Sequence, residues 1–213
     1  LFSLAFKELN LDLHEGTEYV KKKLERDYNK LSNRTKDILD EKDPRVRAKN
    51  TDVDFPLNDE YKDIIPEMLK HLRYSQIEKL SKKYDLRPGM GLAAPQLGIN
   101  KNFFVVCYEV KDGVFDDYIL INPKVISYSE EMIYAGEGEG CLSVNREVEG
   151  IVPRHARITV EAYDLDGNKR KYRVREDLAI AFQHELDHLN GILFVDYIDP
   201  KDPYKNADLY REI

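Results

Sequence analysis

Two histidines four residues apart, His184 and His188, constrain this chain more than any other feature of its sequence. Asp177 is expected to cap a helix around them and Gly191 to end it. Residues four apart share one helix face, so both imidazoles can bind the same metal ion. Glu185 then stands beside that ion, where it can accept a proton from a water molecule. The apolar residues of the same segment recur at helical spacing: Leu178, Phe182, Leu186 and Leu189.

A hydrolytic metal site needs a third protein ligand, and the sequence offers two sources for it. The first is a set of carboxylates downstream of the helix: Asp196, Asp199, Asp202, Asp208 and Glu212. The second is Cys141, which lies upstream in a glycine-flanked stretch and would bind a metal as a thiolate. A metzincin would have another histidine six residues after His188, but Phe194 occupies that position. The spacing of these residues leaves both sources open.

A further segment of interest runs from Gly89 to Gln96 and is rich in small residues. Its glycines let the backbone approach a ligand closely. The side chain of Gln96 offers an uncharged amide donor. We expect this segment to form a turn followed by a short helix.

Together, three segments resemble the signature motifs of the peptide deformylase family, in the family's order and approximate spacing. They read GMGLAAPQ at 89–96, EGCLS at 139–143 and QHELDH at 183–188. The resemblance covers roughly residues 36 to 200. The long stretch between residues 59 and 88, and an insertion after EGCLS, resemble the longer form common in low-GC Gram-positive bacteria. The resemblance implies hydrolysis of the N-formyl group from the N-terminal methionine of newly made polypeptides, with release of formate.

The resemblance also implies a metal and the residues that carry the chemistry. Fe(II) is the implied native metal, and Zn, Ni or Co would replace it, since imidazole and thiolate suit all four. Glu185 would take the proton from water and deliver it to the leaving amine. The Gln96 side chain and the Leu142 backbone N–H would stabilise the oxyanion. The ligands of the one divalent ion per chain would be Cys141, His184 and His188.

An apolar pocket is expected to select the methionine side chain of the substrate. Ile180 and Ala181 lie one turn before the first ligand histidine, and Met90 and Leu142 flank the catalytic segments. The backbone of the Gly89–Gly91 loop is expected to pair with the substrate peptide like an added strand. The predicted substrate contacts are therefore Gly89, Met90, Gly91, Ile180 and Ala181.

Other polar residues near the motifs are expected to support the site. Glu139 should pair with Arg154 and so hold the Cys141 loop in place. Asp187 should orient one of the ligand histidines in the same manner. The remaining histidines are not expected to bind the metal: His14 and His71 at the surface, and His155 at a strand edge.

Composition limits the function and the partners. The net charge of −7 argues against a general nucleic-acid binder, and no apolar run approaches membrane-spanning length. Two cysteines make no disulfide framework, and Cys107 sits in a strand-like apolar run. With Cys141 as a metal ligand, we expect a reducing, cytoplasmic compartment. The expected partners are nascent N-formylmethionyl polypeptides and, transiently, the translating ribosome. We expect a monomer without a membrane or a specific nucleic acid as partner.

The order of the predicted elements indicates an α+β fold, because strands precede the metal helix without βαβ alternation. We expect mostly antiparallel strands packed around a central metal-binding helix. Residues 59–83 read as helical, with Pro66 either kinking this segment or opening a second helix. A hairpin at Asp164–Asn168 should link two of the strands. The predicted strands are 102–110, 118–128, 151–153, 156–163, 170–175 and one near 192–197.

Residues 1–35 are expected to form a helical extension, and residues 36–213 the catalytic domain. Thr17 should cap a helix in the extension. Its apolar face would comprise Val20, Leu24, Tyr28 and Leu31. Packing on the domain is the simpler role for this helix, and binding of a partner or the ribosome is the alternative.

Three other functions remain open on the sequence. An HExxH metallo-endopeptidase would take its third ligand from the downstream carboxylates. A cysteine hydrolase would use Cys141 as nucleophile and would survive chelation of metals. A catalytically silent metal-binding interaction module would bind a metal without turnover, although Glu185 and Gln96 argue against it.

Overall fold

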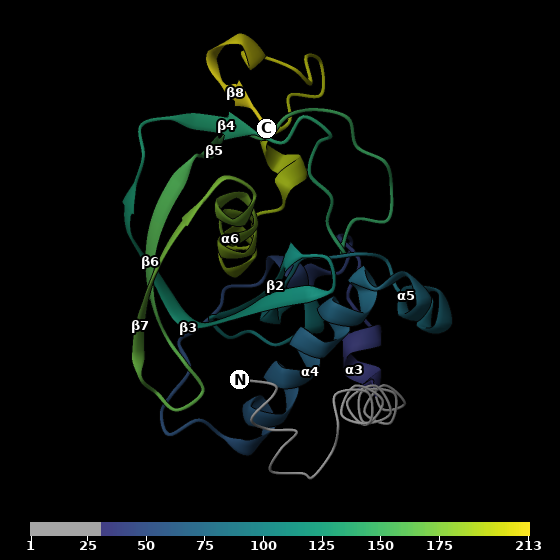
Figure 1. The fold of residues 1–213 in the computed structure, drawn as a ribbon, viewed down its shortest axis with the longest axis vertical. Helices are drawn as coiled ribbons and strands as arrows, with labels where there is room; N and C mark the ends of the chain where they lie inside the picture. The colour runs from purple at the N-terminus through teal and green to yellow at the C-terminus, as the bar shows by residue number, and fades with distance from the viewer. Residues whose placement is uncertain (1–30) are drawn as a thin grey trace, which may run out of the picture. The chain divides into compact units, whose positions relative to one another are not determined.

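The computed structural model describes residues 31–213. The predicted N-terminal helix around Thr17, and His14, lie outside the described residues. The larger of the chain's two compact units is Asn33–Ile213, and the following description concerns this unit. It combines helices with two largely antiparallel sheets, which confirms the predicted α+β class (Figure 1). In residues 31–213, no helix is both long enough and apolar enough to cross a membrane.

The main sheet has five antiparallel strands in the order β1-β2-β3-β6-β7. Its strands are β1 (Gly91–Ala93), β2 (Phe103–Lys111), β3 (Val114–Tyr128), β6 (Arg157–Tyr163) and β7 (Lys169–Arg175). A smaller sheet has the order β5-β4-β8, in which β8 runs parallel to β4. Its strands are β4 (Met132–Tyr134), β5 (Arg154–His155) and β8 (Arg211–Glu212). Strands β1, β4, β5 and β8 were not predicted, because two or three residues carry no detectable alternation.

Four α-helices lie in the described unit, and α6 lies between the two sheets in Figure 1. They are α3 (Asn33–Lys36), α4 (Asp59–Gln76), α5 (Glu78–Tyr84) and α6 (Glu176–Leu189). Single turns of 3-10 helix lie in the connections and after α6: η1 (Pro44–Arg47), η2 (Ala94–Leu97), η3 (Phe194–Tyr197) and η4 (Ala207–Leu209). The arrangement agrees with the prediction of antiparallel strands packed around a central helix.

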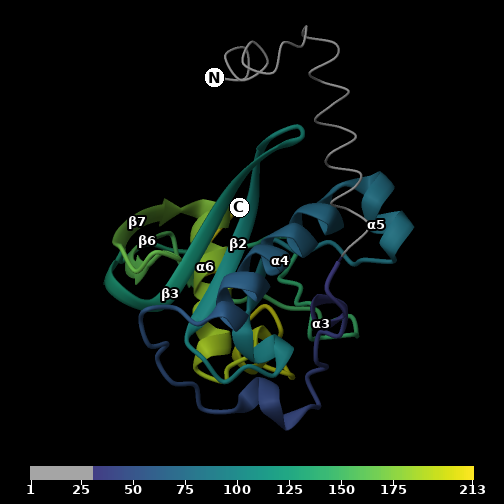
Figure 2. The same cartoon turned by 90° about the horizontal axis from the view of Figure 1, so that it is seen from below.

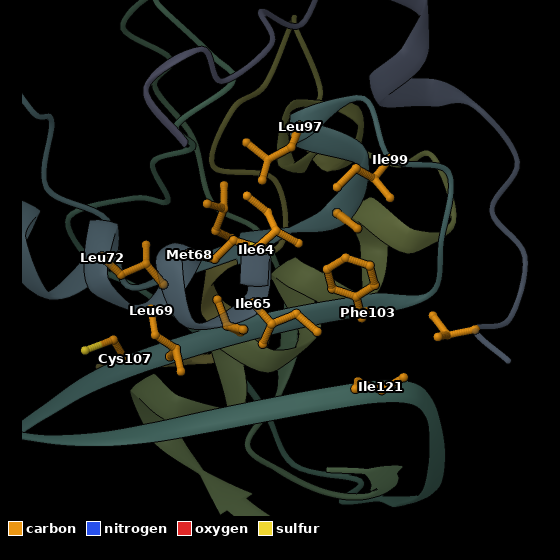
Figure 3. Close-up of a cluster of buried hydrophobic side chains, with 14 of the residues drawn as sticks. Ile64, Ile65, Met68, Leu69, Leu72, Leu97, Ile99, Phe103, Cys107 and Ile121 are labelled. Carbon is orange, nitrogen blue, oxygen red and sulfur yellow. The ribbon is translucent and has the colours of Figure 1, made fainter. Parts of the chain in front are cut away.

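Strand β2 is buried on both faces because it separates two hydrophobic clusters. Successive side chains of a strand point to opposite faces, so Phe103, Val105 and Cys107 face α4, while Phe104 and Val106 face α6. Figure 2 shows α4 lying over β2, and Figure 3 shows apolar side chains of α4 gathered beside Phe103 and Cys107 of that strand. Those residues are Ile64, Ile65, Met68, Leu69 and Leu72. The prediction that Cys107 is a buried strand residue is confirmed.

Helix α6 packs on the opposite face of the sheet from α4. Phe182 meets Phe104 edge-to-face, with ring centroids 5.7 Å apart. Ala179 and Leu189 bury the rest of this face. The main sheet therefore holds α6 along its apolar stripe, and the residues beside that stripe are left to face the loops that carry the other two motifs.

The predicted helix at 59–83 is two helices, and the break is not at the proline. Pro66 lies inside α4, and the chain leaves the helix at Ile77, whose backbone is extended. An interior proline costs about 3 kcal/mol, but burial of the α4 face against β2 outweighs this cost. His71 was expected at the surface, and this prediction is wrong: it is 3% exposed on the packed side of α4.

Two predicted strands are absent. Residues 151–153 form no ladder, and Pro153, which has no N–H to donate, separates them from β5. Residues 194–197 form a 3-10 turn, because the Asp196 carboxylate accepts the Leu193 N–H at 2.9 Å and starts the turn locally.

The start of α6 also differs from the prediction. The helix begins at Glu176, and Asp177 lies in its first turn rather than at the cap. Glu176 lies in the left-handed region, with φ +52°, and its carboxylate accepts two hydrogen bonds from Arg211 at 2.9 and 3.0 Å. Gly191 follows the helix with φ +72°, as predicted for the residue that ends it.

Candidate metal centre and active site

Three side chains converge beside α6 into a group with metal-binding geometry. His184 and His188 come from one face of the helix, and Cys141 comes from the loop between β4 and β5. One potential ligand atom from each lies within 4.8 Å of the others. The Cys141 Sγ is 3.3 Å from the His188 Nε2. The four-residue spacing therefore brings the histidines together as predicted, and the upstream cysteine joins them.

A buried ion-pair network orients His184. Its Nδ1 donates to the Glu139 carboxylate at 2.8 Å, which directs Nε2 toward the metal-binding group. Arg154 donates two hydrogen bonds to the same carboxylate, at 2.7 and 2.9 Å, so the predicted Glu139–Arg154 pair is confirmed. Burial alone would raise the pKa of Glu139, but the bonds from Arg154 and His184 outweigh it and hold that pKa at about 2.

Asp187 was expected to orient a ligand histidine, and this prediction is wrong. Its carboxylate accepts from Arg154 at 2.5 Å and from the Tyr197 hydroxyl at 3.0 Å. The guanidinium of Arg154 also lies over the Tyr197 ring, 5.1 Å from its centroid. Asp187 therefore supports the site one step further out, by holding Arg154 against Glu139.

Gln183 fixes the helix turn that carries the first histidine. Its side-chain amide pairs with the backbone of His155 in β5, accepting the N–H and donating to the C=O at 2.9 Å each. This pairing anchors α6 to the smaller sheet while its apolar stripe packs on the main sheet. Sequence reasoning missed this role, because a glutamine beside HExxH gives no sign of its distant partner.

Glu185 is 3% exposed and lies against the glycine loop. Its Oε2 has no hydrogen-bond partner among residues 31–213. Burial raises the pKa of Glu185 to about 7. A Cβ atom at Gly91 would come within 2.2 Å of Glu185 Oε1. Glycine at this position is therefore required by the buried Glu185 side chain, and not only by a ligand as the sequence suggested.

The Gln96 amide is oriented by three contacts. Its Oε1 accepts the Ala93 N–H at 2.8 Å, which turns the Nε2 toward the Cys141 loop. That nitrogen donates to Ser143 Oγ at 3.1 Å and lies 3.7 Å from Cys141 Sγ. Ser143 is fully buried, and its backbone N–H approaches the same sulfur at 3.4 Å. Ser143 was overlooked in the sequence, although it stands inside the EGCLS motif.

Several of these side chains line one cavity of about 670 Å³. Its lining contains Gln96, Cys141, Leu142, His184 and Glu185. It also contains every predicted substrate contact: Gly89, Met90, Gly91, Ile180 and Ala181. The segments around the three motifs thus form the walls of a single cavity, which is large enough for a small peptide end.

The downstream carboxylates make other contacts. Asp196 pairs with Arg47, and Asp199 accepts from the Lys201 N–H at 2.9 Å and from Lys205. Glu212 accepts from the Tyr134 hydroxyl at 2.9 Å. Within residues 31–213, the His/Cys/Asp/Glu group with metal-binding geometry is Cys141, His184 and His188. The endopeptidase alternative therefore lacks the downstream ligand it requires.

The donor set fits a transition metal. One sulfur and two imidazole nitrogens suit iron, zinc, nickel and cobalt, and a hydrolytic site wants three protein ligands with one open position. The second cysteine is unsuited to this chemistry, because burial raises the pKa of Cys107 to about 12. The residues present thus match a catalytic metal site in number and in chemistry.

Comparison with known proteins agrees with this geometry. The family model described as polypeptide deformylase matches residues 35–204. A peptide deformylase of Macrococcus caseolyticus is 50% identical over 171 residues, which cover 80% of this chain and 93% of that protein. One of Oceanobacillus iheyensis is 47% identical over 169 residues, covering 79% and 92%. A crystal structure of a class I type b peptide deformylase from Acinetobacter baumannii superposes with a TM-score of 0.60 at 27% identity, covering 76% and 96%.

The match extends over most of the chain and most of each relative. The curated relatives also include Bacillus and Staphylococcus proteins, in line with the resemblance to the longer form of the enzyme. With the Cys/His/His group, the HExxH glutamate and the glutamine amide facing one cavity, the chain belongs to the polypeptide deformylase family, the metal-dependent hydrolases that remove the N-formyl group from newly made polypeptides.

Proposed function

We propose that this chain releases formate from N-formylmethionyl peptides in the 670 Å³ cavity beside α6. The observation that carries the proposal is the convergence of Glu185 and Gln96 on the group formed by Cys141, His184 and His188. When bound by this group, a divalent metal supplies Lewis-acid chemistry and makes hydroxide available near neutral pH. The chain's own residues then move the proton and stabilise the developing charge.

Glu185 is the proposed proton carrier. It accepts the proton of the attacking water and later delivers it to the amine of the leaving methionine. Its burial against Gly91 and its unpartnered Oε2 support this role, because the carboxylate has a defined position and a free acceptor.

Gln96 and Leu142 are the proposed oxyanion donors. The Ala93 N–H fixes the Gln96 amide with its Nε2 beside Cys141, so the donor is oriented at the cavity wall before charge develops. The Leu142 N–H belongs to the peptide that follows Cys141, and Leu142 lines the same cavity. Loss of one such donor typically costs about 3 kcal/mol of barrier.

The methionine side chain is proposed to pack on Ile180 and Ala181, which are each 8% exposed at the cavity wall. The A. baumannii deformylase was solved with Met-Ala-Ser bound, which supports a site for an N-terminal methionine. The Gly89 N–H and C=O are bonded to Ser75 and Gln76 of α4. We therefore assign strand-like pairing with the substrate to Gly91, the first residue of the edge strand β1.

Formate release from a formyl-Met peptide, with and without a chelator, tests the proposed activity. We expect turnover that chelation abolishes and that added Fe(II), Ni or Co restores. Cleavage of internal peptide bonds would support an endopeptidase instead, and turnover that resists chelation would support a cysteine hydrolase. Bound metal without turnover would support the silent binding module.

Substrate choice gives a second test. Formyl-Met peptides should react far better than acetyl-Met peptides, because a methyl in place of the formyl hydrogen crowds the metal group. Replacing methionine by alanine should raise the barrier by about 1–3 kcal/mol, the usual effect of unfilled apolar volume. Equal rates for formyl and acetyl substrates would contradict the proposal.

We further propose Fe(II) as the native metal, and a cytoplasmic monomer that meets nascent chains at the translating ribosome. Metal analysis of anaerobically purified protein tests the first point, since the donor set does not choose among Fe, Zn, Ni and Co. Size-exclusion chromatography with light scattering, and cosedimentation with translating ribosomes, test the others. Salt-resistant dimers, or no ribosome retention at low salt, would count against these parts of the proposal.

The last part of the proposal concerns domains. We assign catalysis to residues 36–213 and treat residues 1–35 as an extension, supported by the start of the family match at residue 35. A chain that begins at Ser32 keeps α3, whose Arg34 pairs with Glu60 of α4 at 2.5 Å. We expect it to retain metal and its rate on short peptides. Loss of turnover in this folded protein would show that residues 1–31 help to build the active site.

A further inference from the structure

The Cys141–Val144 turn carries a metal ligand and an oxyanion donor, yet no helix or strand contains it. It lies in the long connection between β4 and β5. Its own contacts are one backbone hydrogen bond, from the Val144 N–H to the Cys141 C=O at 3.1 Å, and the approach of the Ser143 N–H to Cys141 Sγ. The orientation of its peptide planes must therefore be set by residues elsewhere in the chain.

Arg87 supplies much of that control. Its guanidinium donates to three carbonyls of this turn: to Val144 at 3.0 Å, to Cys141 at 3.4 Å, and to Leu142. Arg87 precedes the glycine loop, and Gly89 is itself bonded to Ser75 of α4. The arginine thus ties the turn to the helix that packs on the main sheet.

Carbonyl contacts of this kind also aim the N–H groups of the same peptides. In a trans peptide the C=O and the following N–H point in opposite directions. A guanidinium that holds the Cys141 C=O on the outer side directs the Leu142 N–H to the inner side. The bond to the Leu142 C=O likewise directs the Ser143 N–H, which lies 3.4 Å from Cys141 Sγ. A charged donor on the carbonyl also polarises the peptide and strengthens its N–H as a donor.

We infer that Arg87 is a positioning residue for deformylation: it aims and polarises the Leu142 N–H toward the oxyanion and the Ser143 N–H toward the thiolate sulfur. The inference rests on the proposed oxyanion role of Leu142. Arg87 itself does not touch the reacting atoms. Its side chain is exposed, so its removal should leave the fold intact.

The turn offers a matched control in Arg146. This arginine lines the same cavity, but it pairs with Glu41, at 2.8 and 3.2 Å, and makes no hydrogen bond to the turn carbonyls. Arg87→Gln and Arg146→Gln each remove one exposed guanidinium from the cavity rim. A general effect of rim charge on peptide binding would appear in both variants.

Steady-state kinetics on metal-loaded protein with a formyl-Met peptide is the first readout. Arg87→Gln should lower kcat about ten- to thirtyfold with little change in KM. This loss of kcat is smaller than the roughly 10²–10³-fold loss expected when an oxyanion donor is removed outright, because the hydrogen bond within the turn remains. Because Arg146 lines the substrate cavity, Arg146→Gln can raise KM, but it should keep kcat within about twofold. Methylguanidine should restore part of kcat to Arg87→Ala and none to Arg146→Ala.

The second readout does not depend on turnover. In the cobalt-loaded protein, losing the Ser143 N–H contact makes the thiolate more electron-rich, so the sulfur-to-cobalt charge-transfer band should move to longer wavelength. We expect this shift in Arg87→Gln and not in Arg146→Gln. A shifted band would support the contact even if Leu142 were not the oxyanion donor, which separates this inference from the proposed mechanism.

Three results would overturn the inference. The first is parental kcat in metal-loaded Arg87→Gln. The second is a kcat loss fully explained by lower metal content or by unfolding. The third is an unshifted cobalt band together with no rescue by methylguanidine.

Discussion

Replacing Gly91 by alanine is expected to lower turnover about a hundredfold while the protein stays folded. The alanine Cβ would lie 2.2 Å from Glu185 Oε1, 2.6 Å from its Cδ and 2.8 Å from its Cγ. Ordinary contact begins at 3.4 Å, so the carboxylate must move by roughly 1 Å. The backbone at Gly91 is outside the left-handed region, so the substitution itself adds no backbone strain.

The displacement determines the size of the effect. A shift of about 1 Å in a catalytic group can cost about 10²-fold in rate, which corresponds to about 2.7 kcal/mol of barrier. Stability should change less, by about 1–2 kcal/mol, because the crowded atoms belong to the end of a flexible side chain. The assay measures kcat for formate release on metal-loaded protein, with thermal unfolding in parallel.

Gly140→Ala is the matched control, because its Cβ would meet no atom within 4 Å and the residue adjoins Cys141. Its kcat should stay within about twofold of the parent. In a Glu185→Gln background, Gly91→Ala should add little further loss, since both changes act on one group. Parental turnover in a folded Gly91→Ala protein would refute the reasoning, as would a full additional hundredfold loss in the Glu185→Gln background.

Three further predictions follow from the same structure. Glu185→Gln should keep its metal, but its kcat should fall by a factor of about 10² to 10⁴. Parental turnover in the metal-loaded variant would show that Glu185 is not the proton carrier. Cys141→Ser should lose most of its metal by elemental analysis, whereas Cys107→Ser should retain it, and the reverse pattern would contradict the ligand set. Burial, with the charge of Lys36, lowers the pKa of His71 to about 4 from 6.5. Between these values the unfolded chain binds the proton and the folded chain does not. The free energy of unfolding should therefore fall by about 3 kcal/mol as the pH drops from 7 to below 4, and His71→Gln should lack this contribution in denaturant titrations.

Local patterns along the chain were sufficient for much of the fold and for the choice of motif residues. The helical spacing of Leu178, Phe182, Leu186 and Leu189 predicted α6, and its histidines lie on one face as a period of 3.6 residues requires. Apolar runs with turn residues between them predicted β2, β3, β6 and β7 to within a few residues. These features depend on neighbours in the sequence, so the sequence carries them directly.

Contacts between distant segments decided the rest. The carboxylate that orients His184 belongs to Glu139 and not to the neighbouring Asp187. Glu139 is 45 residues away in the chain, and only the fold brings it within hydrogen-bonding distance. Gly91 faces a carboxylate 94 positions later, and Arg87 reaches carbonyls 54 to 57 positions away. Nothing in the local pattern of a glycine or an arginine encodes such partners. They arise only when burial of β2 between α4 and α6 brings the loops beside the metal group to the same cavity.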